Sequence, residues 1–124
     1  MTMKKKELIV TSALPYANGP LHFGHLLEHI QTDIWVRSQR ILGNHCIYLC
    51  ASDAHGTPIM MKAEEENIAP EKLVDKYMKA HKKTLEAFQV SHDCYYQTHS
   101  EENKKYSELI YNTALENGLS LIHI

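Results

Sequence analysis

The chain has 124 residues, 44 % of them hydrophobic and 23 % charged, which is ordinary for one soluble globular domain and leaves little room for a second. Its formal net charge of −2 gives no overall basic field, so the charge balance does not indicate a nucleic-acid-binding surface. Three cysteines without a framework spacing exclude a disulfide scaffold and predict reduced thiols in a cytoplasmic protein.

A buried strand is predicted over Glu7–Ala13, because its centre is apolar on both faces, as in a central parallel strand. No apolar stretch in the chain approaches the roughly 20 residues that a membrane span requires, so no membrane partner is expected. The turn residues between Pro15 and Pro20 then predict a loop.

A helix is predicted from His25 to Leu42, with Gly43 as its carboxyl-end cap. Its apolar residues recur mostly at three- and four-residue steps and are expected to form one buried face. These residues are Leu26, Leu27, Ile30, Ile34, Ile41 and Leu42. A second strand over His45–Ala51 completes a βαβ unit. Since the carboxyl ends of both strands point the same way, the loop Pro15–His25 and the loop Ser52–Pro58 are expected to open into one crevice.

The rest of the chain alternates in the same manner. A short helix is predicted over Pro58–Asn67, and a longer helix over Pro70–Phe88. A third strand is predicted over Cys94–Thr98. Ser100 is expected to cap a last helix that ends at Gly118. The predicted buried face of this last helix consists of Tyr106, Leu109, Ile110 and Ala114.

The stretch Pro15–His25 carries the strongest chemical signal. It joins a strand to a helix, and ligands bind at that junction in parallel α/β folds. The amino end of the helix offers free N–H groups and the positive end of a dipole to an anion. His22 and His25 add imidazole N–H donors, and Gly24 between them leaves room for a nucleotide to approach the backbone. These residues therefore favour phosphate binding.

A metal site is the competing interpretation. His22, His25 and His29 are three and four residues apart, and Asp53 or His55 could add a ligand from the next loop, as in zinc sites. However, no His-Glu-x-x-His pattern is present, and the approach rich in proline and glycine suits a nucleotide better. Cys46 and Cys50 point to the same face of a predicted strand and are interpreted as core thiols, so no metal ligand is assigned in this chain.

The eleven residues Pro15-Tyr16-Ala17-Asn18-Gly19-Pro20-Leu21-His22-Phe23-Gly24-His25 resemble the His-x-Gly-His signature of class I aminoacyl-tRNA synthetases, most closely of the methionyl family. The similarity runs from about Leu8 to about Gly118. The loop Ser52–Pro58 also looks like the methionyl form rather than the leucyl, isoleucyl, valyl or cysteinyl form. The resemblance implies an α/β fold, a partial Rossmann-like doubly wound parallel sheet that is the first half of a class I synthetase catalytic domain.

The resemblance also implies a role for each matching residue. His22 and His25 are expected to be catalytic, stabilising the ATP phosphates while a carboxylate attacks. The expected nucleotide contacts are Pro15, Tyr16, Asn18, Gly19, His22, Gly24 and His25. The expected methionine contacts are Ala13, Leu14, Tyr16 and, at the α-amino group, Asp53.

The implied activity is that of a methionine–tRNA ligase, which activates methionine with ATP and transfers it to tRNA. Mg²⁺ is expected to travel with ATP, and zinc is expected only in an inserted module after the point where this chain stops. The family's second motif, lysine-methionine-serine-lysine-serine, is absent, so the chain alone is expected to be inactive. Residues 1–118 would be the first half of the catalytic domain. Residues 119–124 would be the truncated start of the inserted module or a non-native tail.

Two other functional classes remain open at this point. One is a different nucleotidyltransferase that carries the same His-x-Gly-His loop; it would exchange pyrophosphate with ATP in the presence of another substrate. The other is a non-catalytic module that binds a nucleotide or a metal; it would bind ATP or zinc as the 124-residue chain.

Overall fold

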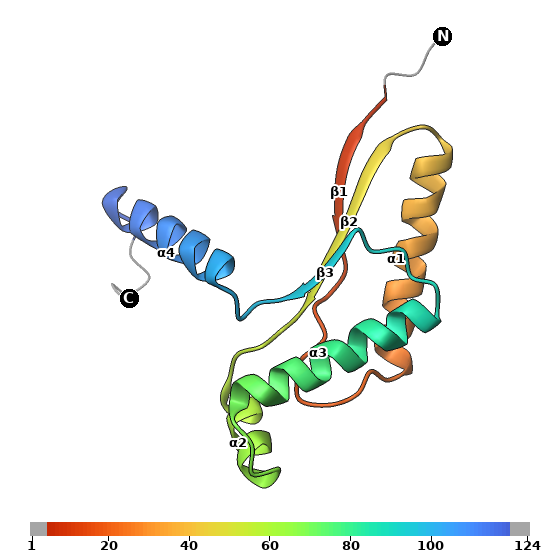
Figure 1. Ribbon diagram of the computed structural model, residues 1–124. Coiled ribbons are helices and arrows are strands. Elements are labelled where there is room, and N and C mark those ends of the chain that lie inside the picture. The colour runs from red at the N-terminus through yellow and green to blue at the C-terminus, as the bar shows by residue number, and fades with distance from the viewer. Residues whose placement is uncertain (1–4, 120–124) are drawn as a thin grey trace.

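The structure is a computed structural model that describes residues 5–119. Its elements are β1 (Glu7–Thr11), α1 (Phe23–Ile41), β2 (His45–Ser52), α2 (Thr57–Glu65), α3 (Pro70–Ala87), β3 (Cys94–Gln97) and α4 (Glu101–Glu116). The three strands form one parallel sheet in the order β1-β2-β3 (Figure 1). The predicted α/β class and parallel sheet are confirmed.

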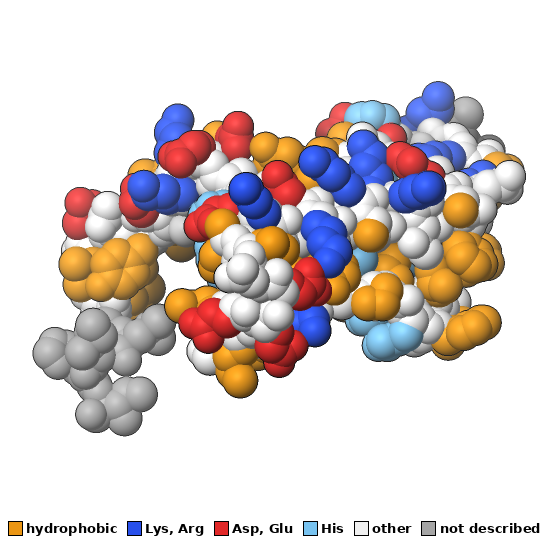
Figure 2. Space-filling model, turned by 60° about the horizontal axis from the view of Figure 1, so that its bottom comes forward, with side chains coloured by type: hydrophobic (Ala, Val, Ile, Leu, Met, Phe, Trp, Pro, Cys, Tyr) orange, Lys and Arg blue, Asp and Glu red, His pale blue; other side chains and the backbone are white. Residues whose placement is uncertain are grey.

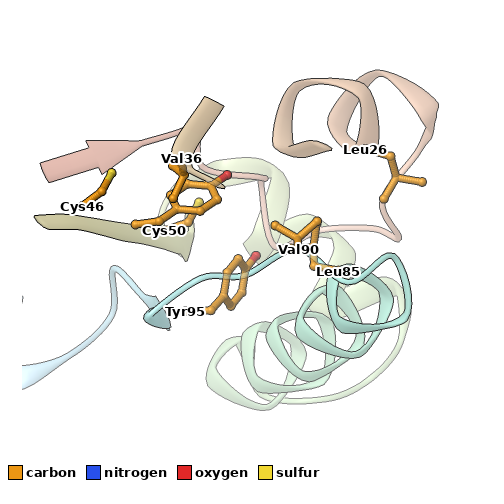
Figure 3. Packing of buried hydrophobic residues seen from close by; sticks show 8 residues of the cluster. Leu26, Val36, Cys46, Cys50, Leu85, Val90 and Tyr95 are labelled. Carbon is orange, nitrogen blue, oxygen red and sulfur yellow. The ribbon is translucent and has the colours of Figure 1, made fainter. Parts of the chain in front are cut away.

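Strand β2 carries the core because it has a neighbour on each side. Its residues alternate in burial, and Cys46, Tyr48 and Cys50 point into one apolar cluster to which α1 and α3 contribute (Figure 3). Both thiols are free and buried, as predicted for Cys46 and Cys50. Strand β1 pairs only with β2, and its central Ile9 is 73 % exposed. The prediction that β1 is buried on both faces is therefore wrong for the described residues.

The face of α1 that meets the sheet differs from the predicted one. Leu27, Ile34 and Ile41 are 58 %, 63 % and 86 % exposed. Leu26 is buried as predicted, and Ile30 packs against the core, but the other buried positions are His29, Asp33 and Val36. Two polar residues occupy this buried stripe because hydrogen-bonding partners on other elements satisfy them, so hydrophobic spacing alone predicted the buried face only in part.

Asp33 is the clearest case of a polar residue placed in the core. It is 6 % exposed, and its carboxylate accepts hydrogen bonds from the Ser91 backbone N–H at 2.8 Å and from Arg37 Nε at 2.5 Å. The Ser91 hydroxyl donates a further bond. Burial raises the pKa of the Asp33 carboxyl, but these bonds outweigh it and hold that pKa below its ordinary value. The interaction ties α1 to the segment before β3.

Replacing Asp33 with asparagine is expected to lower the free energy of unfolding at pH 7 by about 1–3 kcal/mol, because the new amide NH₂ faces the Arg37 guanidinium. Since the pKa of Asp33 is lower in the folded state, its stabilisation is present above the unfolded-state pKa and is lost as pH falls through the folded-state value. Denaturant unfolding from pH 7 to pH 3 should therefore show a smaller acid-induced loss in the variant. Asp75→Asn, at an exposed position of α3, should behave like the unchanged chain.

Helix α4 begins as predicted but does not pack as predicted. The hydroxyl of Ser100 accepts a hydrogen bond from the Asn103 backbone N–H at 3.1 Å, with Glu101 and Glu102 in the first turn. However, α4 projects away from the sheet, and none of its residues 101–116 is buried (Figure 1). Tyr106, Leu109 and Ile110 are exposed, and an apolar patch is visible on this end of the molecule (Figure 2). The predicted buried face is therefore wrong.

Two further observations concern the ends of the chain and its helices. Residues 120–124 of the predicted tail lie outside the residues that the structure describes. Within residues 5–119, no helix is both long enough and apolar enough to cross a membrane.

Candidate active site

The loops that follow β1 and β2 meet at the carboxyl edge of the sheet. Tyr16 and Asp53 form an isolated parallel bridge. The Ala17 backbone N–H donates to the Asp53 carbonyl at 2.8 Å, and the Asp53 N–H donates to the Pro15 carbonyl at 2.8 Å. The prediction that these two loops share one edge is confirmed. Backbone atoms alone make this bridge, so the Asp53 carboxylate is not used to hold the loops together.

His22 and His25 form the start of α1. Their rings are stacked with centroids 3.7 Å apart. His22 Nδ1 accepts a hydrogen bond from the Gly24 backbone N–H at 3.1 Å, and His25 Nδ1 accepts one from the His22 N–H at 3.3 Å. A neutral imidazole whose Nδ1 accepts carries its proton on Nε2. The helix start therefore gives both rings the tautomer that offers an Nε2–H donor.

The protonation of His25 fits this donor role. Partial burial lowers the pKa of His25 below its ordinary value, the nearby His22 and His81 lower it further, and Glu28 opposes the shift. A neutral ring is therefore favoured at pH 7. Glu28 itself accepts a hydrogen bond from the Ala13 backbone N–H at 2.5 Å, which fastens the chain after β1 to α1. Sequence reasoning missed Glu28, because no motif marks a contact across fifteen residues.

Gly24 leaves room for the His22 side chain at the start of α1. A Cβ atom at this position would lie 3.0 Å from His22 Cε1 and 3.1 Å from His22 Nδ1, which is closer than ordinary packing allows. The glycine therefore lets the His22 ring fold back onto the helix start and accept the Gly24 N–H. This role in positioning an imidazole is separate from the predicted approach of a nucleotide to the backbone.

Gly24→Ala is expected to displace the His22 ring and to lower the free energy of unfolding by about 1 kcal/mol, the usual effect of losing a helix cap. Gly19→Ala is a matched control in the same loop, because a Cβ atom there meets nothing within 4 Å. Denaturant unfolding of the two variants compares these effects. Equal stability of both variants would contradict the assigned role of Gly24.

His81 on α3 holds the loop that contains Gly19 through a hydrogen bond. The sequence did not predict this role. His81 is 1 % exposed, and its Nε2–H donates to the Gly19 carbonyl at 2.7 Å. Its Nδ1 then accepts from the Ser52 hydroxyl at 3.0 Å, and Ser52 Oγ accepts from the Tyr95 hydroxyl at 2.9 Å. Burial lowers the pKa of His81, although its bond to Gly19 opposes the shift, and burial raises the pKa of Tyr95 to about 12. This chain of neutral hydrogen-bonding groups connects β3, β2 and α3 to the loop at Gly19.

Tyr16 is positioned by a glycine in the second loop. Gly56 has φ +125°, and a Cβ atom there would lie 2.5 Å from the Tyr16 hydroxyl oxygen. Tyr16 also packs against the apolar cluster that includes Ile59 and Val74. The ring is therefore held between the two loops, where a flat apolar surface could contact a substrate side chain.

Gly56→Ala is expected to lower the free energy of unfolding by about 1–3 kcal/mol and to move the Tyr16 ring, because both φ and the contact exclude a Cβ atom. Gly118→Ala separates these causes: Gly118 also has a positive φ of +74°, but a Cβ atom there meets nothing within 4 Å. Tyrosine fluorescence and thermal unfolding are suitable measurements. A loss no larger than that of Gly118→Ala would argue against the clash with Tyr16.

The remaining predicted residues surround this edge to different degrees. Pro15 is buried, Asn18, Gly19 and Asp53 are half-buried, and Ala13 and Leu14 are exposed. His55 is exposed, with its ring 5.2 Å from that of His99. The metal set considered from the sequence, His22, His25 and His29, is not brought together. Within residues 5–119, the converging group is His29, Cys50 and His92.

Comparison with known proteins agrees with this geometry. A family model described as tRNA synthetases class I (M) matches residues 8–122. The methionine–tRNA ligase of Leptospira biflexa serovar Patoc is 55 % identical over 113 residues, which cover 91 % of this chain and 17 % of the relative. The chain therefore spans about 17 % of the length of the curated relatives that it matches.

Solved structures share the fold. Methionyl-tRNA synthetase of Mycobacterium tuberculosis bound by methionyl-adenylate aligns with a TM-score of 0.87 and 24 % identity, over 92 % of this chain and 22 % of that chain. The agnB2 LeuRS of Agrobacterium radiobacter K84, in a ternary complex with tRNA and LeuAMS, aligns with a TM-score of 0.84 and 20 % identity, over 93 % and 15 % of the two chains.

The parallel α/β sheet is that of a class I synthetase catalytic domain. The chain belongs to the tRNA synthetases class I (M) family, whose model matches residues 8–122.

Proposed function

We propose that the protein containing this chain activates methionine with ATP and transfers it to tRNA. The observation that carries the proposal is the pair His22 and His25, which the helix start holds in the tautomer that exposes Nε2–H donors. Membership of the family and the 55 % identity to a methionine–tRNA ligase support the same substrate. Residues 1–118 would supply the first half of the catalytic domain.

In the proposed reaction, a carboxylate oxygen of methionine attacks the α-phosphorus of ATP. The bond from that phosphorus to the bridging oxygen breaks, and pyrophosphate leaves with the electron pair, while Mg²⁺ accompanies the nucleotide. Negative charge grows on the phosphate oxygens, and the Nε2–H groups of His22 and His25 stabilise it. No protein nucleophile is required, since positioning and electrostatic stabilisation supply the catalysis. A terminal tRNA hydroxyl then takes the methionyl group and releases AMP.

The other residues at this edge would bind the substrates. Asp53 offers a carboxylate to the ammonium group of methionine through a charge-assisted hydrogen bond. Ala13, Leu14 and Tyr16 would contact the thioether side chain, which is soft and polarisable. The ATP loop would consist of Pro15, Tyr16, Asn18, Gly19 and Gly24. The relay from Tyr95 through Ser52 and His81 supports this loop at the Gly19 carbonyl.

ATP–pyrophosphate exchange measured with each of the twenty amino acids tests the proposal. The complete reading frame that contains this chain should catalyse exchange with methionine only, and the 124-residue chain alone should not. Exchange with another amino acid would keep the reaction class and overturn the substrate. Absence of exchange from the complete protein would overturn the proposed activity.

A further inference from the structure

The proposed reaction does not use one group of potential metal ligands. His29 comes from α1, Cys50 from β2, and His92 from the segment between α3 and β3. One ligand atom from each side chain lies within 4.8 Å of the other two. His29 and Cys50 are 1 % and 7 % exposed, and His92 is half-buried. Three separate parts of the chain therefore converge on one small volume.

Several polar side-chain atoms lie close to one ring nitrogen of His29. Three atoms lie near its Nδ1: Ser12 Oγ at 3.1 Å, His92 Nε2 at 3.4 Å and Tyr48 Oη at 3.5 Å. A neutral ring nitrogen either donates one proton or accepts at one lone pair, so it cannot pair well with all three. Two imidazole nitrogens on a tetrahedral zinc ion lie about 3.3–3.4 Å apart, given Zn–N bonds of about 2.0–2.1 Å. The separation between His29 and His92 matches this value.

We propose that His29, Cys50 and His92 form a binding site for one zinc ion. Its ligands are His29 Nδ1, Cys50 Sγ and His92 Nε2. Ser12 Oγ lies beside these ligands, 3.1 Å from His29 Nδ1 and 3.5 Å from Cys50 Sγ. Two imidazoles and a thiolate favour zinc over magnesium and calcium, which prefer oxygen ligands.

Binding exchanges one proton for the ion. Cys50 is a free, buried thiol. As the Zn–S bond forms, the S–H bond breaks and the proton leaves to solvent.

The site would also have a mechanical consequence. Of the three ligands, His92 lines a cavity of about 330 Å³ together with Lys82, Asp93 and Tyr95. An ion held here would clamp α1, β2 and the segment before β3 together. Its role would be structural, and the site is distinct from His22, His25 and Asp53. Metal binding at this site therefore does not depend on the proposed aminoacylation activity.

Cobalt(II) titration of the metal-free, reduced 124-residue chain tests the site, because only three cysteines can produce a thiolate-to-cobalt charge-transfer band. We expect one equivalent of Co²⁺ to give this band with the visible bands of tetrahedral cobalt, and Zn²⁺ to displace it. Cys50→Ser should abolish the charge-transfer band. His92→Phe should weaken cobalt binding at least about tenfold, the smallest effect typical of perturbing a metal site. Cys94→Ser, at an exposed thiol, should leave the spectrum unchanged.

Far-ultraviolet circular dichroism of each metal-free variant checks that the fold is retained, and His92→Phe provides a second test if Cys50→Ser unfolds. Zn²⁺ should raise the thermal midpoint of the unchanged chain but not that of His92→Phe. Three outcomes would overturn the site: no charge-transfer band in the unchanged chain, a band that survives in folded Cys50→Ser, or equal cobalt affinity in folded His92→Phe. Activity plays no part in these measurements.

Discussion

His25→Ala in the complete protein is expected to slow the proposed formation of methionyl-adenylate about a hundred- to a thousandfold, the usual effect of removing one donor to a developing oxyanion. The variant loses an Nε2–H donor whose tautomer is set by the hydrogen bond from the His22 backbone to His25 Nδ1. Because that donor acts on charge that grows in the transition state, methionine affinity should stay nearly unchanged. Single-turnover pyrophosphate release and equilibrium methionine binding separate the two effects.

His45→Ala is the matched control for this experiment. His45 is an exposed histidine at the start of β2, at the opposite end of the strand from Asp53. It should leave both the rate and the methionine affinity unchanged. Undiminished adenylate formation in His25→Ala would remove the assigned role. Weaker methionine binding with an unchanged rate at saturating methionine would instead place His25 in ground-state binding.

Asp53→Asn is expected to weaken methionine binding at least about thirtyfold, because loss of a charge partner at a binding site typically costs about 2 kcal/mol or more. The substitution keeps the side-chain size and the backbone bonds that join Asp53 to Pro15 and Ala17. Thermal stability should therefore remain close to that of the unchanged protein. Methionine binding measured by calorimetry is the primary readout, with KM for methionine in pyrophosphate exchange as the second.

Methioninol, which keeps the ammonium group but lacks the carboxylate, sharpens the Asp53 test. Its binding should fall in Asp53→Asn by a factor similar to that of methionine, because the lost contact is to the shared ammonium group. Asp75→Asn, at an exposed carboxylate on α3, should change neither affinity. Unchanged methionine binding in Asp53→Asn would show that the Asp53 carboxylate does not receive the amino group.

Several features of this protein follow from local sequence. Pro15, Gly19 and Pro20 predict the loop that follows the first strand, and the apolar segment around Tyr48 forms the second. A βαβ unit then brings the two following loops to one edge, as the bridge between Tyr16 and Asp53 shows. Ser100 marks the start of α4 because capping is a contact within one turn. Such features depend on neighbours in sequence, so pattern reasoning finds them.

Other features depend on contacts between distant residues, and only the tertiary structure decided them. The buried stripe of α1 contains His29 and Asp33 because distant residues satisfy them. Ser91, which donates a hydrogen bond to Asp33, lies 58 residues away in sequence. The apolar residues of α4 stay exposed because no described element covers them.

The site shows the same division between local and distant causes. The sequence identified His22, His25 and Asp53 as candidates, since a motif and a strand end mark them. It did not show that Gly24 admits the His22 ring, that His81 holds the Gly19 carbonyl, or that His92 lies beside His29. A buried polar group is stabilised only by partners that satisfy it, and those partners become known when the chain has folded.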